Sequence, residues 1–338
     1  MSEVLTVKKT ALGLLAVVAV AGLLARGPVA RAEPVRIGVL QFGTVSWGLE
    51  VVQQHGLDQA EGCDLEVQPF ANNGATAVAL QAGAVDVIVN DWIWVARQRA
   101  EGQGYSFVPY STALGALMVP AGSAIAGPAD LKGKRLGIAG GPLDKSWLLL
   151  RALSRERFGF DLADEVEAVF AAPPLLNEQI LAGRLDAVLT YWHYAARLDA
   201  AGLGRVMDVA GMGRALGIES GVPLVGYVFD EAWAATRREA LLGCFRAIQA
   251  ANRILAGSDA EWERLRPLMK AGDEATFVAL REGFRAGIPR RWGEAERADA
   301  ARLFAIMAEL GGAALVGKEL AEGAGRMPEG TFWPLVVY

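Results

Sequence analysis

VRIGVLQFGTVSW, at residues 35–47, joins an apolar strand to a loop of polar and aromatic side chains. Two later stretches repeat this design: ANNGATAVALQAGAVDVIVNDW at residues 71–92 and LNEQILAGRLDAVLTYW at residues 176–192. In open α/β sheets, ligands bind at the loops that follow the carboxyl ends of the strands. The three stretches therefore predict an α/β protein that binds a ligand at one edge of a sheet.

The first 32 residues have the pattern of an export signal. Lys8 and Lys9 precede an unbroken apolar run at residues 11–25, and Ala30-Arg31-Ala32 forms a small-x-small cleavage site before Glu33. Because the run is short for a bilayer span, the sequence favours cleavage after Ala32 over retention as a membrane anchor. We expect a periplasmic protein.

Charge and cysteine content narrow the class of the mature chain. Residues 33–338 carry 29 basic and 37 acidic side chains, a net charge of −8, which disfavours nucleic acid as a partner. Cys63 and Cys244 are the only cysteines. The sequence leaves open whether they form a disulfide or remain separate buried residues, because it does not give their Cα separation.

Strand and helix patterns alternate along two similar units. The first unit has strands at residues 35–40, 65–69 and 85–89 and helices at 48–55, 75–82 and 91–100, and the second has strands at 135–139, 166–170 and 187–190 and helices at 146–155, 175–182 and 194–200. This order predicts parallel strands with right-handed crossovers in each unit. Extended pieces at 107–112 and 114–119 join the units. From Thr236 onward the pattern is helical, at 238–255, 275–285 and 295–310.

The three opening stretches, together with ADLKGKRLGI at residues 129–138, resemble periplasmic substrate-binding proteins of ABC importers, in the group that binds nitrate, taurine, alkanesulfonates and thiamine pyrimidines. The resemblance covers residues 35–229 and, more loosely, the helical tail. It implies the type II periplasmic-binding fold, an α/β fold in which two lobes close over the ligand. Residues 33–113 and 222–338 would form lobe one, with the helical tail packed on it, and residues 114–221 lobe two.

The resemblance points to four loops as ligand contacts. The first contains Phe42, Thr44, Ser46 and Trp47, where the alternative is that Ser46 caps the next helix and Trp47 packs on the lobe. The second contains Asn72 and Asn73, where the alternative is an ordinary Asn-Gly turn.

The third loop, Asn90, Asp91 and Trp92, is the strongest candidate, although Asp91 could simply cap a helix. The fourth contains Asp144, Lys145 and Ser146 at a helix start, where related proteins present backbone N–H groups to an anion. Asp144 and Lys145 replace the small residues expected there, which disfavours a simple sulfonate or nitrate. Tyr191, Trp192 and His193 form a further aromatic edge of the same cleft.

Catalytic patterns are absent from the sequence. His55 and His193 have no Ser, Cys or carboxylate partner at a known catalytic spacing, and no zinc or phosphate-loop motif occurs. We therefore expect a monomeric solute-binding receptor without enzymatic activity, metal or cofactor, which delivers its solute to an ABC permease of the inner membrane.

Two alternatives share this fold: a chorismate-dehydratase-like enzyme, and an accessory periplasmic protein that serves a dehydrogenase without transport. The export signal argues against the enzyme. Five rings, those of Trp47, Trp92, Trp147, Tyr191 and Trp192, are predicted at the binding edge beside Asp91 and Asp144. They favour a small organic solute with a ring or apolar body and a donor or cationic group, while Lys145 is available to bind an acidic group if the solute has one. The alternative is that most of these rings belong to the lobe cores.

Overall fold

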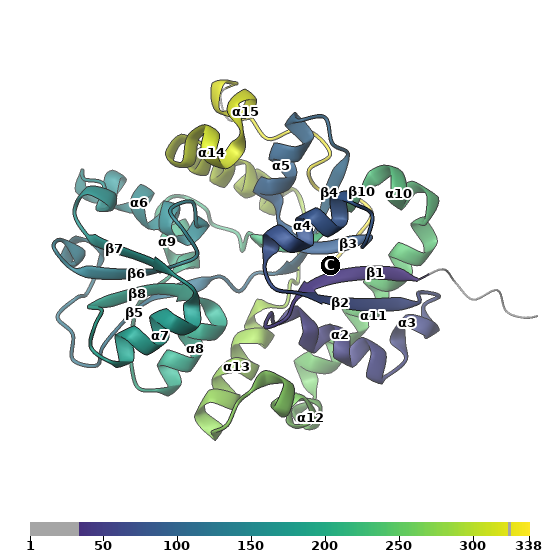
Figure 1. Cartoon of the computed structure of the whole chain (residues 1–338), viewed down its shortest axis with the longest axis horizontal. Coiled ribbons are helices and arrows are strands. Elements are labelled where there is room, and N and C mark those ends of the chain that lie inside the picture. Colours follow the sequence, from purple (N-terminus) through teal and green to yellow (C-terminus); the bar gives the residue numbers. More distant parts are fainter. Residues whose placement is uncertain (1–33, 324–325) are drawn as a thin grey trace, which may run out of the picture.

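The computed structural model describes residues 34–323 and 326–338; the predicted export signal lies outside them. Two five-stranded sheets form two lobes that lie side by side (Figure 1). The strand order is β2-β1-β3-β10-β4 in the first sheet and β7-β6-β8-β5-β9 in the second. The predicted two-lobed α/β architecture is confirmed.

Lobe one is built on the first sheet. Its strands are β1 (Val35–Leu40), β2 (Leu65–Phe70), β3 (Val87–Asp91), β4 (Tyr105–Ser111) and β10 (Val225–Asp230), and its first helices are α2 (Val45–Gln54), α3 (Leu57–Ala60), α4 (Asn73–Gln81) and α5 (Trp92–Ala100). β1 pairs in parallel with β2 and β3, as the alternating pattern predicts. Their loops therefore emerge at a common edge.

Lobe two repeats the arrangement. Its strands are β5 (Gly115–Val119), β6 (Arg135–Ala139), β7 (Glu167–Ala171), β8 (Ala187–Tyr191) and β9 (Gly204–Asp208), and its α-helices are α6 (Lys145–Phe158), α7 (Pro173–Leu181), α8 (Trp192–Ala200) and α9 (Val209–Ala215). Two 3₁₀ turns, Pro128–Leu131 and Leu162–Asp164, complete it. β6 pairs in parallel with β7 and β8.

Each lobe has an equivalent Arg–Asp ion pair that joins two of its parallel strands. Asp86, directly before β3, accepts hydrogen bonds from the backbone N and the guanidinium of Arg36 in β1. Asp186, directly before β8, does the same for Arg135 in β6. In each lobe a carboxylate thus sets the register of two parallel strands and the position of the loops beyond them.

Two strands, β9 and β10, were missed by the sequence pattern, and both pair antiparallel. β10 lies between β3 and β4, and β9 pairs with β5. The chain crosses between the sheets after Ser111 and returns to β10 after α9. The parallel prediction therefore holds only within each βαβ unit, because a strand that returns from the other lobe is not bound by crossover geometry.

The C-terminal helices are α10 (Glu231–Thr236), α11 (Arg238–Gly257), α12 (Asp259–Met269), α13 (Glu274–Gly287), α14 (Glu294–Val316) and α15 (Lys318–Glu322). α11 packs on α2 of lobe one, as expected. α13 also packs on α8 of lobe two, and α14 on both α5 and α6. The tail therefore contacts both lobes.

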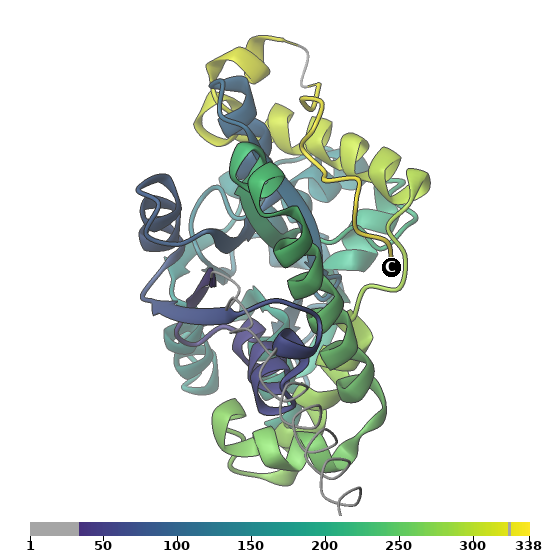
Figure 2. The ribbon, with the colours of Figure 1, turned by 90° about the vertical axis from the view of Figure 1, so that its right-hand side faces the viewer.

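The C-terminal segment, residues 326–338, covers an edge of the first sheet. Figure 2 shows it running back along the molecule to the C-terminus. The Phe107 backbone of edge strand β4 donates to Thr331 O and accepts from Trp333 N, and Trp333 packs on Phe229. Covering an edge strand in this way protects it from pairing with another chain.

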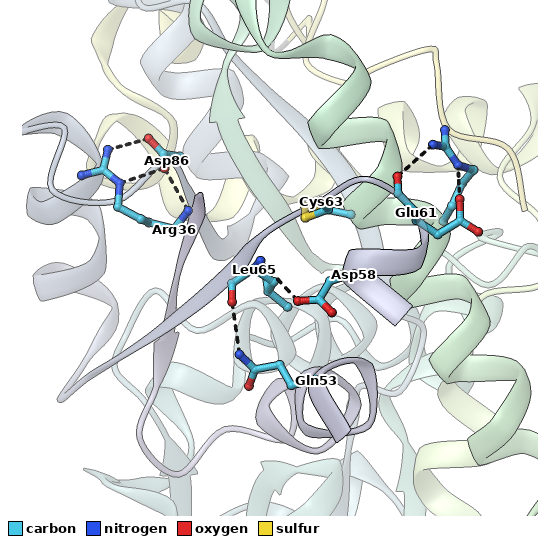
Figure 3. Close-up of a disulfide and its surroundings, with 9 residues drawn as sticks. Arg36, Gln53, Asp58, Glu61, Cys63, Leu65 and Asp86 are labelled. Atoms are coloured by element: carbon cyan, nitrogen blue, oxygen red, sulfur yellow. Dashed lines mark hydrogen bonds and ion pairs between the residues drawn. A yellow bond between two sulfur atoms is a disulfide. The ribbon is translucent and has the colours of Figure 1, made fainter. Parts of the chain in front are cut away.

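Cys63 and Cys244 form a disulfide, which settles the alternative that the sequence left open. Their Cα atoms are 5.3 Å apart, and the bond joins the loop before β2 to α11 (Figure 3). It lies entirely within lobe one and leaves no free cysteine among residues 34–323 and 326–338.

Candidate functional site

An ion pair joins the two lobes at the predicted ligand-binding edge. Lys145 Nζ, at the first residue of α6 in lobe two, lies 2.7 Å from Asp91 Oδ2, at the end of β3 in lobe one. Both side chains are largely buried, with 27% and 14% of their surface exposed. The third and fourth predicted loops therefore meet across the lobes.

Asp91 performs two roles with its two carboxylate oxygens. Oδ1 caps α5 by accepting from Trp94 N at 2.8 Å, and Oδ2 accepts from Lys145. Asn90 Oδ1 accepts from the backbone N of Asp91 and turns the chain at this point. Both carboxylate oxygens of Asp91 therefore have a hydrogen-bond partner, and the ammonium group of Lys145 balances the charge of the carboxylate.

Asp144 likewise occupies the N-terminus of α6. Its Oδ1 accepts from Ser146 N and Trp147 N, at 2.9 and 3.3 Å. The hydroxyl of Tyr191 donates to the same carboxylate. The Asp144 carboxylate thus bonds to the backbone N–H groups that would face a ligand anion in the proteins that the sequence resembles. Ser146 is itself buried.

Burial and charge compete in this network. Burial raises the pKa of Asp144, and the neighbouring Lys145 only partly offsets that effect. Burial alone would lower the pKa of Lys145, but the carboxylates of Asp91 and Asp144 outweigh it and raise that pKa above its usual value. Lys145 is therefore a charged ammonium at neutral pH, held between two carboxylates from different lobes.

The residues of the first predicted loop have different roles. Thr44 is buried, and its hydroxyl is 3.3 Å from that of Tyr110. Ser46 does not cap α2: Thr44 occupies the N-cap position, and Ser46 Oγ donates to Gly43 O instead. Phe42 is 65% exposed, with Lys270 Nζ 4.6 Å from its ring centroid.

The second loop begins a helix rather than forming a turn. Asn72 caps α4 by accepting from Ala75 N, and Asn73 is the first residue of that helix. The Asn-Gly turn is therefore wrong for this segment. Both asparagine side chains are exposed.

Three of the five rings predicted at the binding edge belong to the lobe cores. Trp92 is fully buried against Phe304 and Phe332, and its Nε1 donates to Pro223 O. Trp147 and Trp47 are only 2% and 5% exposed. Their burial disfavours ligand stacking on these rings, because a helix that starts at the binding edge turns part of its first face inward.

Trp192 has a different role, because it packs between the lobes. Its ring lies edge-on to Trp47 of lobe one, with centroids 6.1 Å apart. A Cβ at Gly283 of α13 would lie 2.8 Å from the same ring, so only glycine permits this approach. One turn further along α8, Arg197 donates to the carbonyls of Met269 and Lys270 in lobe one. Part of the Trp192 ring is therefore buried in the contact between the two lobes.

Sequence reasoning placed His193 at this edge but missed two polar residues beside it, Asn177 and Thr190. Each of the three has a buried polar atom without a hydrogen-bond partner in the described structure. Only the position of Thr190 directly before the predicted loop could have singled it out.

Acidification should destabilise the protein through His193. Burial, with a smaller effect from Arg197, lowers the pKa of His193 to about 3. The unfolded chain, with an ordinary pKa near 6.5, then binds the proton more readily, so stability falls as the pH drops from about 6.5 toward 3. At pH 5 the free energy of unfolding should be about 2 kcal/mol lower than at neutral pH because of His193.

Urea denaturation at pH 7 and pH 5 measures that loss, which His193→Gln should remove. The same experiment on His55→Gln, which replaces the only other imidazole of the chain, is the control for the loss of a histidine. An unchanged pH dependence in His193→Gln would show that His193 is not the group responsible.

Within residues 34–323 and 326–338, no cluster of three or more His, Cys, Asp or Glu side chains is arranged to hold a metal ion. The same residues include no helix with the length and hydropathy needed to cross a bilayer.

Two lobes joined by two chain crossings, with polar loops facing each other, define the class of two-lobed binding folds. The model of the family described as "NMT1/THI5 like" matches residues 44–249, more than half of the chain. The protein belongs to this family. A comparison with curated protein sequences gives no match.

Solved structures confirm the fold of the periplasmic binding proteins. The aliphatic sulphonate-binding protein SsuA of Escherichia coli has a TM-score of 0.67 at 18% identity, and the alkanesulfonate-binding protein SsuA of Xanthomonas axonopodis pv. citri, bound to MOPS, has 0.65 at 18%. Both alignments cover 89% of this chain and 99% of the other. A DSZB mutant in complex with biphenyl-2-sulfinic acid matches at 0.56 and 15%, covering 89% and 98%.

Proposed function

We propose that this protein is a periplasmic solute-binding receptor that captures a small organic molecule between its lobes and delivers it to an ABC permease. Family membership and the likeness to periplasmic binding proteins support this proposal. The observation that carries it is the Asp91–Lys145 contact, because it brings loops of both lobes together at the edge where α/β folds bind ligands.

The environment of both histidines supports a receptor rather than an enzyme. His55 pairs with Glu261 on the surface of lobe one, and His193 lies among Tyr191, Trp192 and Tyr194. Neither imidazole is paired with a serine or cysteine in the hydrogen bonds of the described residues. We further propose that the chain acts as a monomer and is cleaved after Ala32. The intact mass of the recovered protein should then be that of a chain that begins at Glu33.

The receptor function predicts that a solute stabilises and compacts the protein. A ligand at 100 times its Kd should raise the free energy of unfolding by about 2.7 kcal/mol. A thermal-shift screen against a broad solute library identifies such ligands, and small-angle scattering should show a smaller radius of gyration when one is added. Turnover of the solute, or its binding without compaction, would contradict this function.

The ion pair between the lobes should favour the closed arrangement. Lys145→Met and Asp91→Asn each remove one charge of the pair, and the asparagine keeps an oxygen that can cap α5. Both variants should therefore show a larger radius of gyration than the wild type in the absence of solute.

Lys132→Met is the matched control for that measurement. It removes an exposed ion pair with Glu165 that lies within lobe two. Its radius of gyration should equal that of the wild type. If Lys145→Met and Asp91→Asn are as compact as this control, the ion pair does not govern closure.

A further inference from the structure

Three unpartnered polar atoms lie in one corner of lobe two, out of five such buried atoms in the described residues. They are Asn177 Oδ1 of α7, Thr190 Oγ1 of β8 and His193 Nδ1 of α8. Native proteins leave few buried polar atoms unpaired, so this concentration calls for an explanation.

The strand pleat places Thr190 on the face of the sheet that α7 and α8 cover. Side chains two apart on a strand share a face, and Val188 packs with Leu176 of α7 and Ala195 of α8. Asn177 reaches the same place, because its Nδ2 donates to Tyr194 O in the first turn of α8 at 3.1 Å. His193 is the neighbouring residue in that turn.

This corner adjoins the contact between the lobes. Thr190 directly precedes Tyr191, which bonds to Asp144, and His193 directly follows Trp192, whose ring contacts Trp47 of lobe one. The corner is therefore at the carboxyl end of β8, at the edge that holds the Asp91–Lys145 pair.

The chemistry of the three atoms defines what can bond to them. Asn177 Oδ1 only accepts, whereas a threonine hydroxyl and a neutral imidazole nitrogen can donate or accept. An oxyanion would place a second acceptor against Asn177 Oδ1. A neutral group with both an N–H or O–H donor and an acceptor satisfies all three.

We propose that Asn177, Thr190 and His193 form a subsite of the binding cleft that recognises a neutral donor–acceptor group of the solute, such as an amide. This inference rests on the proposed receptor function and narrows its solute class. The three residues select the solute, while the Asp91–Lys145 pair acts between the lobes.

Stability measurements test whether Thr190 serves a ligand or the fold. Thr190→Val keeps the shape and removes the unpartnered hydroxyl, so the melting temperature should rise, by about 2 °C. Thr76→Val is the matched control: Thr76 is equally buried, but its hydroxyl donates to Asn73 O at 2.9 Å. The control should melt at a lower temperature than the wild type. A fall in Thr190→Val like that of Thr76→Val would overturn the proposal, because the hydroxyl would then already have a partner such as a buried water.

Paired probes test the solute class. Nicotinamide and benzamide carry the neutral amide, and nicotinate and benzoate are their anionic counterparts. The amides should raise the melting temperature of the wild type more than the acids, and Thr190→Val should weaken amide binding about 3- to 10-fold.

The inference and the receptor function can fail separately. If neither amide binds, or if the acids bind better, the inference is overturned. If a library solute still compacts the protein in that case, the receptor function stands. If no solute in the library binds, the receptor function fails as well.

Discussion

Replacing Cys63 and Cys244 together with alanine is expected to lower the free energy of unfolding by about 3–5 kcal/mol. The bond joins residues 181 positions apart, so it removes much of the conformational freedom of the unfolded chain. Both cysteines are buried, with 2% of their surface exposed. Alanine is apolar, so the double replacement places no polar group in the core. Urea denaturation of the oxidised wild type and the double variant measures the difference.

The reduced wild type is the control for the double variant. Addition of a reductant should bring the wild type close to the stability of the variant and should leave the variant unchanged. Equal stability of the oxidised wild type and the variant would show that this bond does not stabilise the fold. Solute binding should persist in the variant at temperatures where it is folded, because the bond lies within lobe one, away from Lys145.

Trp92→Ala is expected to destabilise the protein by about 3–5 kcal/mol. The Trp92 side chain is fully buried between Phe304 of α14 and Phe332 of the C-terminal segment. Its Nε1–H donates to Pro223 O at 2.9 Å, in the segment where the chain returns to lobe one. Truncation would leave a cavity and an unpaired carbonyl at a position that supports the lobe crossing.

Trp94→Ala is the matched control, because Trp94 is in the same helix but only half-buried, beside Tyr105. Its loss of stability should be clearly smaller. Thermal and urea denaturation of the two variants measure the contrast. Wild-type stability in Trp92→Ala with loss of solute binding would instead support the original expectation of a ligand contact.

The backbone of the site could be predicted from the sequence because its signals are local. The loops at Asp91 and Asp144 both follow short apolar strands and both begin helices, and the structure has both residues as helix caps. A short polar side chain before an apolar helix is a sufficient signal for this. The strand of residues 225–230 was missed because its partners, β3 and β4, lie far away in the sequence.

The roles of the rings could not be predicted. Trp92 and Trp192 occupy the same position relative to Asp86 and Asp186 in the two lobes, and each is the first residue of its helix. Trp92 is enclosed by α14 and the C-terminal segment, whereas Trp192 meets Trp47 and Gly283 of the other lobe. The local pattern of an Asp, an apolar strand and a helix-starting Trp is the same in the two cases, but the elements packed against it differ.

The sequence by itself determined the two α/β units, the parallel strands within them and the helix caps at Asp91 and Asp144. These features depend on hydrophobic periodicity and capping, which act over a few residues. The tertiary structure alone decided that Cys63 bonds to Cys244, that Lys145 pairs with Asp91 across the lobes, and that Trp92 is core. Each of these contacts joins residues more than 50 positions apart, and their approach depends on how the lobes and the C-terminal helices pack together.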